Sequence, residues 1–157
     1  MAPAAETLED SSRRIGHHAW IEQRLFETLG AWVPTTPEPA AKARMAEQSL
    51  HHAWRAELWH GLLPAVPHLA VADLVVAPPG APAPPAAAST ADRLGWLCGE
   101  VLPALLDGYA EHLARTTVVT DGPTIRVLGL VTADTRADLA AGRALLSTLG
   151  PGPSPRL

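Results

Sequence analysis

Residues 47–60 have the sequence EQSLHHAWRAELWH, and the expected fold depends on this stretch more than on any other. It contains two of the five tryptophans, three of the seven histidines and two carboxylates. Its apolar residues recur at the three- and four-residue spacing of an amphipathic helix. A second stretch with this spacing, residues 15–29, shares the tetrapeptide HHAW, which occurs at His17–Trp20 and at His51–Trp54. We therefore expect two related helices in the first half of the chain.

The composition narrows the class of protein. A length of 157 residues fits one domain. The single cysteine, Cys98, excludes an internal disulfide framework. A net charge of −4 with scattered basic residues argues against nucleic acid and against an anionic membrane as partners. The first residues have no apolar h-region, so we expect that they are not a secretory signal. The sequence shows no apolar run of the roughly 18 residues that a membrane span needs and no phosphate-binding motif. We expect a cytoplasmic bacterial protein without a nucleotide cofactor.

Four long helices are predicted from periodicity and from start and stop signals. Thr7 and Asp10 resemble a capping box at the start of the first helix, which Gly30 and Pro34 end. The other predicted helices span about residues 39–63, 90–115 and 124–149. Residues 1–6 and 150–157 are predicted tails, so that one domain spans 7–149.

Residues 64–89 join the second and third predicted helices and contain seven prolines, which exclude a regular helix throughout. A connection of this length can run along a whole helix, so that the third helix starts at the same end of the molecule as the second. The alternative is a disordered loop between two helical hairpins. The predicted fold is an all-α four-helix bundle with a long proline-rich crossover.

Several charged residues project toward the predicted core when each helix is turned by about 100° per residue. Glu22 lies in the middle of the apolar stripe of the first helix, and His18 lies one turn before it. In the second helix the main stripe is formed by Leu50, Trp54 and Leu58, with Glu47 and His51 on its inner side. A short loop places Glu22 opposite residues 47–51, and Asp138 of the fourth helix reaches the same level.

Buried carboxylates cost several kcal/mol unless they are paired, protonated or bound to a cation. The candidate metal ligands are Glu22, Glu47, His51, His18 and Asp138. Imidazole and carboxylate ligands together favour Fe, Mn or Zn over Ca or Mg. The alternative is a metal-free network in which the glutamates hydrogen-bond to histidines and to tryptophan N–H groups.

The third helix contributes no acid to this cluster, because Glu100, Asp107 and Glu111 project away from its apolar face. That face consists of Leu94, Cys98, Val101, Leu105, Tyr109 and His112. We expect Cys98 to be an inert core thiol, and Tyr109 and His112 to make hydrogen bonds within the core.

The second helix has another apolar side, which includes Met45 and Trp59. The proline-rich segment or a second subunit must cover it, so a homodimer through this helix is a candidate assembly. Trp20 and Trp96 lie beside the main stripes, where they pack under the proline-rich segment or line a pocket for a small apolar ligand. The candidate pocket or interface residues are Trp20, Trp54, Met45 and Trp59.

The arrangement resembles the ferritin-like superfamily of di-iron and di-manganese carboxylate proteins over about residues 7–149. In that family, each half of the bundle supplies a Glu from one helix and Glu-x-x-His from the next. Glu22 matches the first-helix ligand, and Glu47 with His51 matches the second-helix pair at a spacing of four residues instead of three. The fourth helix offers only Asp134 and Asp138, so the resemblance implies a mononuclear, altered or lost site.

The segment HAW-x-x-ELW is also similar to uncharacterised actinobacterial ferritin-like proteins. The resemblance implies an oxidase or oxygenase that acts on a small organic substrate. The alternative function is a metal-free binding or assembly module, with a buried polar network in place of the metal site.

Overall fold

The computed structural model describes residues 6–86 and 88–150, and the predicted tails lie outside these ranges except for Glu6 and Gly150. The described residues form an all-helical protein without a strand, so the predicted all-α class is confirmed. The helices are α1 (Leu8–Trp32), η1 (Val33–Thr35), α2 (Pro39–His60), α3 (Val71–Leu74), α4 (Thr90–Trp96), η2 (Leu97–Val101), α5 (Leu102–Arg115) and α6 (Val118–Thr148). None of them combines the length and apolar character needed to cross a membrane.

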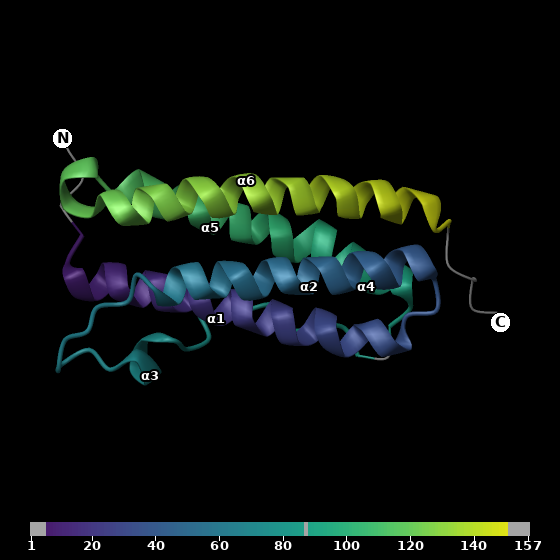
Figure 1. Cartoon of the computed structure of the whole chain (residues 1–157), viewed down its shortest axis with the longest axis horizontal. Coiled ribbons are helices and arrows are strands. Elements are labelled where there is room, and N and C mark those ends of the chain that lie inside the picture. The colour runs from purple at the N-terminus through teal and green to yellow at the C-terminus, as the bar shows by residue number, and fades with distance from the viewer. Residues whose placement is uncertain (1–5, 87, 151–157) are drawn as a thin grey trace.

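Helices α1 and α2 form an antiparallel hairpin (Figure 1). Thr7 caps α1, because its hydroxyl accepts a hydrogen bond from the backbone N–H of Asp10 at 3.1 Å. Pro39 starts α2, where its fixed φ suits the first turn of a helix. Ser49 donates to the backbone carbonyl of Phe26 at 2.8 Å, which fixes the level of the two helices relative to each other.

Helices α1, α2, α5 and α6 lie side by side, and α2 and α5 run in the same direction (Figure 1). The start of α4 lies beside the start of α2, where the Thr90 hydroxyl donates to Glu38 at 2.5 Å. Between α2 and α4 the chain therefore returns to the end of the molecule at which α2 begins (Figure 1). On the way, α3 packs on α1 so closely that a Cβ atom at Gly16 would lie 2.1 Å from the carbonyl oxygen of Leu74. That this arrangement is a ferritin-like four-helix bundle with a proline-rich crossover stays a prediction.

The predicted third helix is divided into α4, the π-helical turn η2 and α5. Pro103 is the second residue of α5, and a proline inside a helix removes one hydrogen bond and clashes with the preceding turn. The wider turn of η2 accommodates this change. The apolar stripe is nevertheless continuous, since all six of its predicted members are buried: Leu94, Cys98, Val101, Leu105, Tyr109 and His112.

Helix α2 presents a different face to the core from the one predicted. Leu50 and Trp54 are 67% and 43% exposed, whereas Met45 and Trp59 are buried in the core. The prediction that Met45 and Trp59 form a pocket or subunit interface is therefore wrong. The buried face of α2 also carries polar residues that pair with α1 and α6. A prediction from apolar spacing assigns such residues to the surface, so it favoured the other face of the helix. These residues are Ser49, His52 and Arg55, and Gln48 is buried on the same face.

Candidate functional site

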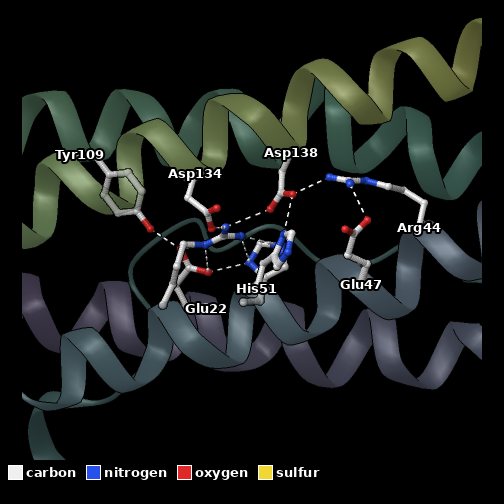
Figure 2. A network of polar contacts seen from close by, with 9 residues as sticks. Glu22, Arg44, Glu47, His51, Tyr109, Asp134 and Asp138 are labelled. Atoms are coloured by element: carbon white, nitrogen blue, oxygen red, sulfur yellow. Dashed lines mark hydrogen bonds and ion pairs between the residues drawn. The ribbon is translucent and has the colours of Figure 1, made fainter.

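The guanidinium of Arg55, on α2, lies at the centre of a buried polar network. Figure 2 shows Glu22, Asp134 and Asp138 from this network. Its Nε donates to both carboxylate oxygens of Glu22 on α1 at 3.2 Å. Its Nη1 donates to Asp138 Oδ2 on α6 at 2.9 Å and also to Asp134. The Arg55 and Glu22 side chains are fully buried and that of Asp138 is 2% exposed, so this cation joins carboxylates from two helices inside the core.

Glu22 accepts hydrogen bonds from three side chains on two helices. Besides Arg55, His52 Nδ1 lies 2.6 Å from Glu22 Oε2, and the Tyr109 hydroxyl donates to Oε1. Burial opposes ionisation of Glu22, but the interactions with His52, Arg55 and Tyr109 outweigh it, so its pKa is lowered. Burial and the nearby Glu22 charge raise the pKa of Tyr109, which remains a protonated donor. Glu22 is therefore a buried carboxylate whose charge is balanced by protein groups.

His52 is the neutral member of this network. Burial is the largest influence on its pKa, which is lowered, and the charge of Arg55 acts in the same direction. With Nδ1–H donating to Glu22, His52 Nε2 is unprotonated, and Arg55 Nη2 lies 2.9 Å from Nδ1 and 3.4 Å from Nε2. Burial also disfavours the charge of Arg55, but Glu22 and Asp138 outweigh it and raise the pKa of the guanidinium.

A second part of the network is centred on Asp138 and includes Arg44, Glu47 and His51 (Figure 2). Asp138 Oδ1 accepts from Arg44 Nη2 at 2.5 Å and lies 2.8 Å from His51 Nδ1. Arg44 also donates to Glu47 at 2.8 Å. The side chains of His51 and Glu47 are 35% and 58% exposed. Both oxygens of Asp138 are thus bonded to arginines.

The five predicted metal ligands do not converge. Glu22 and Asp138 are buried in the network, and His51 lies at its edge. The inward placement of Glu47 is wrong, because its side chain is exposed and pairs with Arg44. His18 is buried but lies apart from the other four, against α5.

The predicted level of the first hairpin was also inaccurate. Glu22 contacts His52 and Arg55, about one turn beyond residues 47–51, where it was expected. The cause is η1, which continues the first helix to Thr35 and shifts the connection toward the C-terminus of the chain.

His18 belongs to a second buried cluster, which is aromatic. Its Nε2 lies 3.2 Å from His112 Nδ1, and its ring centroid lies 4.6 Å from that of Trp59 and 4.9 Å from that of Tyr109. Burial and the neighbouring His112 lower the pKa of His18 to about 3. Burial and Arg14 lower the pKa of His112 to about 4. Both imidazoles are therefore neutral near pH 7 and act as hydrogen-bonding groups.

One group of potential metal ligands exists in the described part of the chain. His51, Asp134 and Asp138 each offer an atom within 4.8 Å of the others. However, Arg55 Nη1 already bridges the two aspartates, and Arg44 occupies the other oxygen of Asp138. A divalent ion at this position would add two positive charges beside a buried guanidinium. The residues as arranged do not fit the metal centre that the ferritin-like resemblance implies.

Sequence reasoning missed Arg55, although one signal was present. Arg55 lies three residues after His52 and four before Trp59, so it shares the helix face of the buried residues. An arginine in phase with buried residues, opposite two buried acids, is the natural partner for those acids.

Comparison with protein-family models, with curated proteins and with solved structures found no match to this chain. The ferritin-like resemblance therefore rests on the residue pattern, and the function has to be argued from the geometry of the site.

Proposed function

We propose that this chain is a metal-free helical binding or assembly module, in which an arginine-centred network replaces the metal centre of ferritin-like proteins. The observation that carries this proposal is the position of Arg55, whose buried guanidinium contacts Glu22 on α1 and both Asp134 and Asp138 on α6. In di-metal carboxylate bundles, the cations that balance inward acids are the metal ions. In this chain the Arg55 side chain balances the charge of the acids, and unlike a metal ion it offers no open coordination position.

The chemistry of the network supports a structural role for it. Its central groups are Glu22, His52, Arg55 and Tyr109, all fully or almost fully buried, and each bonds to at least one of the others. Such a network fixes the relative positions of α1, α2, α5 and α6 and leaves the surface to provide the contacts with a ligand or partner. In some proteins, buried polar or ionic groups specify register and pairing.

Metal content per chain tests the proposal. Tag-free protein purified without chelator should contain no stoichiometric Fe, Mn or Zn, and should acquire none after anaerobic addition of Fe(II). One or two equivalents of metal, lost in Asp138→Asn but kept in Glu47→Gln, would overturn it. Glu47→Gln is the matched control, because Glu47 is exposed and contacts the network only through Arg44.

A second candidate function is a mononuclear metal protein, and it is favoured by the proximity of His51, Asp134 and Asp138. An ion there requires Arg55 to move away from both aspartates. Bound Fe or Mn would supply redox chemistry for an oxidase or oxygenase acting on a small organic substrate. Metal that is lost in His51→Ala would select this function over the metal-free module.

A further inference from the structure

A cleft of about 330 Å³ lies between α1, α5 and residues 78–82 of the proline-rich segment. This volume is within the range of small-molecule sites. Helix α1 packs closely along α2 and only sparsely against α5, and the cleft lies on the α5 side of α1. Residues 78–82 have the sequence PPGAP, and Gly80 has a φ of +73°, which allows the sharp turn that closes this wall.

The walls of the cleft are mainly apolar. Ile21 of α1 faces Val101, Ala104 and Leu105, which follow one another across the end of η2 and the start of α5. Prolines 78, 79 and 82 form the side contributed by the crossover. A wall of prolines loses little conformational freedom when a ligand binds, because proline is already restricted in φ. The cleft is thus suited to a compact apolar group.

His18 supplies a polar group to this apolar cleft. His18 is 6% exposed, and its Nε2 lies 3.2 Å from His112 Nδ1. Among the described residues, Nδ1 of His18 has no hydrogen-bond partner. A Cβ atom at Gly108 would lie 3.8 Å from His18 Cε1, so a larger side chain at this position of α5 would cover the ring. Gly108 thus leaves the ring accessible from the α5 side.

The free nitrogen accepts a hydrogen bond when His18 donates to His112, and donates one when His112 is the donor. A hydroxyl group is compatible with both arrangements, since it is both donor and acceptor, whereas a carboxylate can only accept. The charges at the rim also disfavour an anion. Arg14 is already paired with Glu6 at 2.8 Å, and Glu111 adds a negative charge.

We propose that this cleft is a binding site for a small neutral molecule that combines an apolar ring with a hydroxyl group, the hydroxyl bonding to His18. The site rests on the proposed function only in treating the chain as a binding module. It lies on the α5 side of α1 and shares no residue with the Arg55 network, so the metal analysis and the ligand test can each fail without the other.

The test uses 2-naphthol as the probe and the full chain, with binding measured by calorimetry and the His18 ring followed by NMR. Binding should shift the His18 ring resonances, and 2-naphthoate should bind at least ten-fold more weakly. Ala104→Phe and Gly108→Leu fill the cleft and should abolish binding. Ala110→Phe, an exposed position of α5 outside the cleft, should bind like the natural chain.

His18→Phe should weaken 2-naphthol binding roughly 2- to 10-fold, the effect of losing one neutral hydrogen bond. Ala104 is exposed, so Ala104→Phe should fold even if Gly108→Leu does not. Absence of 2-naphthol binding up to its solubility limit would overturn the proposal. Equal affinities for 2-naphthoate and 2-naphthol would also overturn it. So would binding of 2-naphthol to Ala104→Phe that leaves the His18 ring resonances unshifted.

Discussion

Replacement of Arg55 by methionine is the sharpest test of the network. Methionine keeps much of the aliphatic stem and removes the guanidinium, so the main loss is electrostatic. Glu22 and Asp138 are then left in the core without their shared cation. Removing one partner of a buried ion pair costs about 3–5 kcal/mol. Asp134 adds little, because its side chain is 31% exposed and water screens it.

We therefore expect Arg55→Met to lower the free energy of unfolding by about 3–5 kcal/mol, out of the roughly 5–15 kcal/mol typical of a domain. In urea unfolding followed by circular dichroism at pH 7, the midpoint should fall by about 1 M or more. Arg24→Met is the control. Arg24 pairs with Glu27 on the surface, at 59% and 46% exposure, and its loss should cost less than about 1 kcal/mol.

A double-mutant cycle with Glu22→Gln separates charge from packing. In the natural chain, Glu22→Gln should destabilise, because it removes the anion that faces Arg55. In the Arg55→Met background it should stabilise, because it removes an uncompensated buried charge. An effect of Glu22→Gln with the same sign in both backgrounds would refute the role given to the Arg55 charge, as would a cost of Arg55→Met no greater than that of Arg24→Met.

Three further predictions concern other parts of the molecule. The folded pKa of His18, about 3, lies below its ordinary value of 6.5, so the unfolded chain binds more protons between these values. The contribution of His18 to the free energy of unfolding should be complete above pH 6.5 and should fall toward pH 4. In urea titrations at several pH values, the free energy of unfolding should depend less steeply on pH in His18→Phe. Gly16→Val should destabilise by about 1–3 kcal/mol in the same assay, because its side chain collides with the backbone of Leu74. If α2 forms the predicted homodimer, the contact should use its exposed face, so that Trp54→Glu should yield monomers in sedimentation; a monomeric natural chain contradicts the dimer.

The sequence by itself determined the helices, because their signals are local. The Thr7 cap and the apolar stripe of residues 94–112 depend on residues a few positions apart. The apolar spacing of the first helix also places Glu22 in the core, and that of the fourth helix places Asp138 at the edge of its apolar stripe. In each case the neighbours along one helix were sufficient to give the orientation.

Only the tertiary structure decided what surrounds those acids. Helix α2 has two faces that are nearly equal in apolar character, and the choice between them depends on pairing with other helices. The face with Arg55 and His52 turns inward because their polar groups meet Glu22 and Asp138, which lie 33 and 83 positions from Arg55 in the chain. The level of the hairpin likewise depends on η1, a single turn. Burial of a charge is favourable only beside its partner, and the folded chain alone brings those partners together.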